Sequence, residues 1–232
     1  MTREQHSQSL ISQYIEKFLE EHLGEKPEQV TVIYRHPFLL IHLTGFILPS
    51  EKMFVEKGLW NKVLEVRDLL MDSVKEDLLN GLQEYSDGKL TNLYADWNLS
   101  KRSGMLIATM EKDSLQGEFP WPKKVDEDIL REIILLNSMR TQKIPDQTNF
   151  YWLSEQVLLI ERIGILIDIE KKLVENGVKE ELRLAKRPLE LRIIQLFNLE
   201  SVLNGQVLDL FVDWDFQQDV SYMVLLLEER RS

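Results

Sequence analysis

The chain has 232 residues with 39 acidic and 28 basic side chains, so its formal net charge is −11. Both halves are acidic, and this charge argues against nucleic acid or anionic lipid as the main partner. Cysteine is absent, which excludes disulfides, thiolate metal sites and a cysteine nucleophile. No apolar run approaches the roughly 18 residues of a membrane-spanning helix. We therefore expect a cytoplasmic protein with no direct membrane insertion.

The first half of the chain reads as helix, hairpin, long helix and hairpin. Gly24 followed by Pro27 ends the first helix, and Ser50 is a natural N-cap for a second, which Gly58 interrupts. The expected elements are a helix over 9–23, strands over 30–34 and 38–46, a helix from 50, a long helix over 59–85 and a hairpin over 88–112.

The same pattern returns in the second half. Residues 38–58 align without a gap on 157–177, and residues 88–112 align on 205–229. The offset is 119 residues in the first block and 117 in the second. Between the two blocks, the second copy carries Pro188 in an otherwise helical stretch, which predicts a shortened or broken helix there.

These observations predict an α+β protein made of two repeated α-ββ-α-ββ domains, each an antiparallel sheet covered by helices. The boundary is the stretch DSLQGEFPWP over 113–122, whose two prolines and glycine suit neither a helix nor a central strand. We expect a first repeat over 1–117, a linker over 118–124 and a second, diverged repeat over 125–232.

A single repeat of this kind would have open sheet edges and apolar helix stripes, which symmetric dimers commonly cover. Fusion of two repeats predicts an intramolecular pseudo-dimer, with the whole chain a monomer or a homodimer. The broad apolar stripe from Ile129 to Leu136 belongs either to the interface of that pseudo-dimer or to the core of the second repeat.

Two acids precede tryptophans at matching places in the last hairpin of each repeat, Asp96 before Trp97 and Asp213 before Trp214. The carboxylates could orient a partner's donor or a cation. Alternatively, they accept backbone N–H groups at a turn or edge while the tryptophans pack on a helix.

Glu51 recurs as Glu170, each followed by lysine, which marks either a surface used by both repeats or a helix-opening acid favoured by the dipole. Arg67 lies on the otherwise apolar face of the long helix. It could pair with a buried acid, project to a partner, or extend its charged end to solvent while its stem is buried.

The side chains offer little for catalysis. His36 and His42 share a hairpin, but Glu155 and Glu161 stand at these positions in the second repeat. We expect no metal, no cofactor and no catalytic residue, because no combination of base, orienting group and nucleophile is present.

Several motifs together resemble the MpsC-like family of small bacterial proteins. They are Gly24-Glu25-Lys26-Pro27, Leu48-Pro49-Ser50-Glu51, Glu65-Val66-Arg67, and Gly88 through Asp96 to Gly104. Members usually have a single copy, so this chain is similar to a fused pair. The second repeat departs from the pattern with Asp146, Asp168 and Ser221 in place of Pro27, Pro49 and Gly104.

The resemblance implies a role in a bacterial membrane system that generates membrane potential, in a cation-translocating or inorganic-carbon-uptake setting. It carries over no catalytic residue, so we expect a non-enzymatic accessory or regulatory protein. The partner would be a membrane-protein complex, which would place the chain at the inner face of the membrane. The alternative is a small-molecule-binding regulator with a ligand cleft between the repeats.

Overall fold

The chain forms two compact units, Met1–Gly117 and Glu118–Ser232. The structure is a computed structural model that describes residues 3–111, 118–196 and 199–228. Of the predicted boundary, residues 113–117 lie outside the described part. Each unit combines a four-stranded antiparallel sheet with helices, which confirms the predicted α+β class. The packing of the two repeats as a pseudo-dimer stays a prediction.

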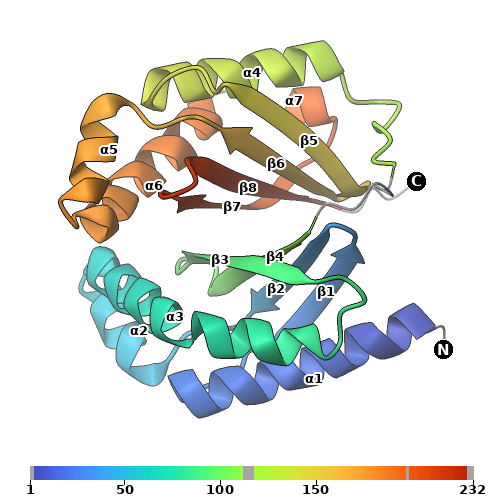
Figure 1. Cartoon of the computed structure of the whole chain (residues 1–232), viewed down its shortest axis with the longest axis vertical. Helices are drawn as coiled ribbons and strands as arrows, with labels where there is room; N and C mark the ends of the chain where they lie inside the picture. The colour runs from blue at the N-terminus through green and yellow to red at the C-terminus, as the bar shows by residue number, and fades with distance from the viewer. Residues whose placement is uncertain (1–2, 112–117, 197–198, 229–232) are drawn as a thin grey trace. The chain divides into compact units, whose positions relative to one another are not determined.

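The first unit has the predicted order of elements (Figure 1). They are α1 (Arg3–Leu23), β1 (Gln29–Arg35), β2 (Phe38–Thr44), α2 (Pro49–Glu56), α3 (Trp60–Gln83), β3 (Leu90–Asn98) and β4 (Ser103–Met110). The strands follow the order β1-β2-β4-β3, so the two hairpins meet where β2 pairs with β4. Because successive side chains along each strand point to opposite faces of the sheet, one face is available for the helices to cover.

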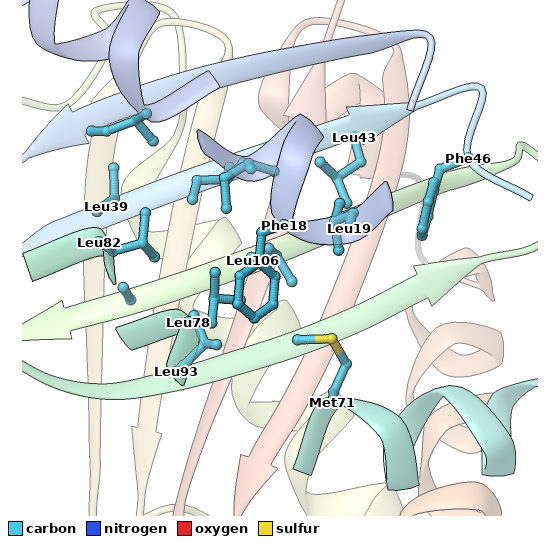
Figure 2. Close-up of a cluster of buried hydrophobic side chains, with 14 of the residues drawn as sticks. Phe18, Leu19, Leu39, Leu43, Phe46, Met71, Leu78, Leu82, Leu93 and Leu106 are labelled. Carbon is cyan, nitrogen blue, oxygen red and sulfur yellow. The ribbon is translucent and has the colours of Figure 1, made fainter. Parts of the chain in front are cut away.

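The core of the first unit lies between α1, α3 and this sheet face. Leucines from helices and strands gather there with Phe18 and Met71 (Figure 2). In α3, Gly81 lies against the Tyr14 ring, where a Cβ atom would come within 2.3 Å of Tyr14 Cζ. A side chain at this position would have to displace the Tyr14 ring, and this close approach explains a glycine inside the helix.

The second unit repeats this architecture (Figure 1). Its elements are α4 (Glu127–Thr141), β5 (Gln147–Ser154), β6 (Val157–Ile163), α5 (Asp168–Glu175), α6 (Lys179–Leu196), α7 (Leu199–Leu203), β7 (Val207–Asp215) and β8 (Val220–Leu227). The strand order is β5-β6-β8-β7.

The sequence repeat corresponds to a structural repeat in register as well as in order. Phe38 pairs with Thr109 in the first sheet, and their counterparts Val157 and Leu226 pair in the second. Both sheets also have an irregularity near the start of the last hairpin, between Leu90 and Asn92 and between Val207 and Asp209. The offsets of 119 and 117 residues therefore give equivalent positions in the two units.

The prediction that Pro188 breaks the helix is wrong, whereas the helix is shorter than its counterpart, with 18 residues in α6 against 24 in α3. Pro188 lies inside α6, which continues to Leu196. Proline removes one backbone hydrogen bond, but its side chain here is on the exposed surface. Lys186 and Glu190, on either side of it, are both buried in ion pairs, with Glu170 and Arg162 respectively. These contacts hold the helix together across the proline.

Two apolar segments of the second half pack within the second unit. Leu130, Ile133 and Ile134 from the predicted stripe lie in its core. In the predicted linker, the ring of Trp121 lies 5.6 Å from that of Phe150. Both segments therefore contribute to the core of the second unit.

Candidate functional site

Arg67 stands at the centre of a buried cluster in the first unit, which we call the Arg67 cluster and which consists of Phe46, Glu51, Arg67 and Trp97. Its Nε donates to Glu51 Oε1 at 2.7 Å and its Nη2 to Glu51 Oε2 at 2.6 Å. Nη2 also donates to the Phe46 carbonyl at 3.2 Å. The guanidinium carbon lies 5.0 Å from the Phe46 ring centre and 4.6 Å from that of Trp97. This bidentate pair among aromatic rings joins α2, α3 and β3.

Arg67 is 1% exposed, so the expectation that it extends to solvent is wrong and the buried ion pair is the correct alternative. The guanidinium needs two acceptors in a fixed geometry, and the Glu51 carboxylate supplies both. Trp97 closes the cluster from the sheet. Its ring lies against Gly104 on β4, where a Cβ atom would be 2.4 Å from Trp97 Cε3.

Glu51 also caps α2. Its Oε2 accepts the backbone N–H of Leu48 at 2.9 Å, and Leu48 is the N-cap residue. The prediction that Ser50 is the N-cap is therefore wrong, because Pro49 begins the helix and Glu51 occupies the third helical position. One carboxylate thus fixes the first turn of α2 and binds Arg67.

The second unit has a reduced form of this cluster. Lys186 is the equivalent of Arg67, and its Nζ donates to Glu170 Oε1 at 2.7 Å. Glu170 Oε2 accepts the backbone N–H of Ile167 at 3.1 Å, as Glu51 does for Leu48. Lys186 Nζ lies 5.7 Å from the Trp214 ring centre. A lysine cannot form the two parallel bonds that Arg67 makes.

Asp96 and Asp213 do not join these clusters. Asp96 is buried opposite Met105, and strand alternation places it on the other sheet face from Trp97. Asp213 Oδ1 accepts the backbone N–H of Trp214 at 2.8 Å and lies 3.1 Å from Arg183 Nε in an ion pair. For Asp213 and both tryptophans, the structure therefore supports the packing alternative.

Burial lowers the pKa of Lys186 below its ordinary value of 10.5, an effect that Glu170 and Glu190 oppose. In the pH window just below 10.5, the unfolded chain then binds more protons at this lysine than the folded chain does. The stability contribution of this group is present above pH 10.5 and is lost as the pH falls through the folded pKa. We expect Lys186→Met to gain stability relative to the wild type as the pH falls through that window. Urea unfolding at several alkaline pH values measures this, and a pH-independent difference would contradict it.

The largest buried polar group was not expected from the sequence. We call it the Arg162 network, and it consists of Asn137, Ser138, Arg162, Glu190 and Ser221. Arg162 Nη1 and Nη2 each donate to a Glu190 oxygen at 3.0 Å, and both side chains are 0% exposed. Arg162 also donates to the Ser138 and Ser221 hydroxyls at 3.2 and 3.0 Å. Asn137 Nδ2 donates to Glu190 Oε2 at 2.8 Å.

The equivalent positions in the first unit are apolar. Arg162 and Glu190 correspond to Leu43 and Met71, while Asn137 and Ser138 correspond to Phe18 and Leu19. Figure 2 shows these four apolar side chains in the core of the first unit. Aligning the two repeats places Arg162 and Glu190 at positions that are apolar in the first unit, but the alignment does not show that they pair with each other.

A third buried group lies around Glu161 on β6. Its Oε2 accepts from Asn149 Nδ2 and the Tyr151 hydroxyl, each at 3.0 Å, and its Oε1 accepts from the Tyr222 hydroxyl at 2.8 Å. Burial and then the charge of Glu161 raise the pKa of Tyr151 well above its ordinary value. The first unit has His42 at the position of Glu161, so the units differ on this sheet face as well.

Comparison with known protein families assigns one part of the chain. Residues 3–112 match the family described as the Na+-translocating membrane potential-generating system (MpsC). The first unit belongs to the MpsC family. The match includes the whole Arg67 cluster of the MpsC unit, whereas the second unit lies outside it. No curated protein and no solved structure is significantly similar to the chain.

Within residues 3–111, 118–196 and 199–228, no helix combines the length and hydropathy needed to cross a bilayer. In the same residues, no three or more histidine, aspartate or glutamate side chains are grouped as a metal site would require.

Proposed function

We propose that this chain is a non-enzymatic accessory or regulatory subunit of a Na+-translocating, membrane-potential-generating system. The observation that carries the proposal is the match of residues 3–112 to the MpsC family, which includes every helix and strand of the first unit. The partner would be a membrane-protein complex, and the chain would work at the inner face of the membrane.

The contacts of the charged side chains support a binding role over catalysis. Glu51 and Arg67 pair with each other inside the first unit, and Arg162 and Glu190 are fully buried in the second. A catalytic acid, base or nucleophile has to reach a substrate, whereas these groups hold helices and strands together. What a partner can contact is therefore the surface around these clusters.

Affinity purification of the tagged full chain from its own membranes tests the proposal. In mild detergent, we expect the same integral membrane proteins to be recovered repeatedly, with an untagged strain as control. Deletion of the gene should reduce the Na+-dependent membrane potential, and the full chain supplied in trans should restore it. Bicarbonate uptake in the same strains tests the link to inorganic carbon. Repeated recovery of no membrane component, with an unchanged potential in the deletion strain, would overturn the proposal.

A further inference from the structure

The connection between α2 and α3 exposes large apolar side chains. Met53 and Phe54 on α2 are 59% and 46% exposed, and Leu59 and Trp60 at the start of α3 are 44% and 37% exposed. Helix α2 contains no buried residue. A contiguous exposed apolar patch on a folded protein commonly marks a protein or membrane contact. We call residues 52–62, with the sequence KMFVEKGLWNK, the α2–α3 segment.

The charge of the α2–α3 segment differs from that of the whole chain. It contains three lysines, Lys52, Lys57 and Lys62, and one acid, Glu56, in a chain of net charge −11. All four side chains are exposed, and Lys62 pairs with Glu65 at 2.8 Å. Lysines around exposed aromatic and aliphatic side chains are typical of segments that lie at a bilayer surface.

The fold itself does not require this composition, because the second unit lacks it. Its α5–α6 connection, residues 171–181, contains three lysines and three glutamates and no aromatic residue. Leu173 and Val178, the equivalents of Phe54 and Leu59, are half-buried. Exposed apolar side chains at these four positions are therefore specific to the first unit.

The segment also has a favourable position for contact with a flat surface. The strand β2 has the β1–β2 turn at one end and leads to α2 from the other, so the segment lies at one end of the first unit (Figure 1). Its apolar side chains come from α2, the turn after it and the first residue of α3. Exposed side chains at one end of a unit suit a bilayer surface, whereas a partner helix usually binds in a groove.

We infer that the α2–α3 segment binds the surface of an anionic lipid bilayer. Trp60 and Phe54 would lie at the level of the headgroups, with Met53 and Leu59 beside them at the boundary of the acyl chains. Lys52 and Lys57 would contact anionic headgroups, which attract local positive charge even when the rest of the protein is acidic. The inference goes beyond the proposed accessory role, because it concerns binding to lipid and can be tested with lipid vesicles without any partner protein.

Flotation of the purified full chain with vesicles tests the inference. We expect binding to vesicles of phosphatidylcholine with phosphatidylglycerol, weakened by salt, and little binding to phosphatidylcholine alone. Brominated phosphatidylglycerol should quench part of the tryptophan fluorescence, and Trp60→Phe should lose that quenching. Absence of wild-type binding to the anionic vesicles would overturn the inference.

Matched variants show whether the α2–α3 segment itself binds. Phe54→Ser with Trp60→Ser, and separately Lys52→Glu with Lys57→Glu, should each lower the partition coefficient about tenfold or more. The control is Ile169→Ser on α5, where an apolar side chain is 66% exposed, and it should bind as the wild type does. Variants that bind like the wild type would overturn the inference, with circular dichroism confirming that they are folded.

The two proposals fail separately. If the chain floats with no vesicle but still co-purifies with a membrane complex, the lipid inference is wrong and the accessory role stands. If it binds anionic vesicles but recovers no membrane protein and leaves the potential unchanged, the accessory role is wrong and lipid binding stands.

Discussion

Replacing Arg162 with leucine should lower the free energy of unfolding of the second unit by about 3–5 kcal/mol. The change leaves the Glu190 carboxylate buried at 0% exposure without its bidentate partner. The Ser138 and Ser221 hydroxyls also lose the donor that they share. Denaturant titration of the full chain measures the loss, and hydrogen exchange assigns it to the second unit.

The matched control for Arg162→Leu comes from the first unit, which has Leu43 and Met71 at the equivalent positions. The double variant Arg162→Leu with Glu190→Met should be more stable than Arg162→Leu alone, because it removes the unpaired charge. Apolar replacements of buried ion pairs are commonly neutral or stabilising. A double variant less stable than the single one would contradict this account of the network.

Replacing Glu51 with alanine should lower the free energy of unfolding of the first unit by about 3–5 kcal/mol. Arg67 would stay buried without a carboxylate, and the Leu48 N–H would lose its acceptor at the start of α2. We expect hydrogen exchange to increase first in α2 and the adjoining turns of α3, because Glu51 joins these two helices. Denaturant titration of the full chain gives the size of the loss.

The control for Glu51→Ala is Glu65→Ala, which removes another glutamate from the same region. Glu65 pairs with Lys62 on the surface, where ion pairs contribute little to stability. We therefore expect little change in the unfolding midpoint. Equal losses for Glu51→Ala and Glu65→Ala would show that burial of the Arg67 pair is not the source of its stabilisation.

The units share a scaffold but differ in what they bury and expose. The MpsC unit has apolar side chains at the positions of the Arg162–Glu190 pair and an exposed α2–α3 segment, whereas the second unit has that charged pair and a more polar equivalent segment. A buried ion pair requires specific geometry, while an apolar core tolerates varied packing.

Much of the fold follows from the sequence by itself. Apolar alternation, helical spacing and breakers such as Gly24 and Gly58 gave the order of helices and hairpins in both units. The recurrence of residues 38–58 and 88–112 gave their equivalence. These signals are local, or compare the chain with itself, so they do not depend on knowing which distant residues meet. The family match to the first unit likewise followed from motifs within one repeat.

Only the tertiary structure decided which charged side chains are buried and what they contact. Arg67 is compatible with exposure or burial until Glu51, 16 residues away, is placed beside it. Arg162 and Glu190 lie on different elements 28 residues apart, and no local pattern pairs them. Pro188 predicts a helix break, but tertiary contacts on both sides keep α6 continuous. In each case the outcome depends on packing between distant segments. Burying a charge or an unpaired hydrogen-bonding group costs more free energy than the local helix or strand propensity of a residue contributes.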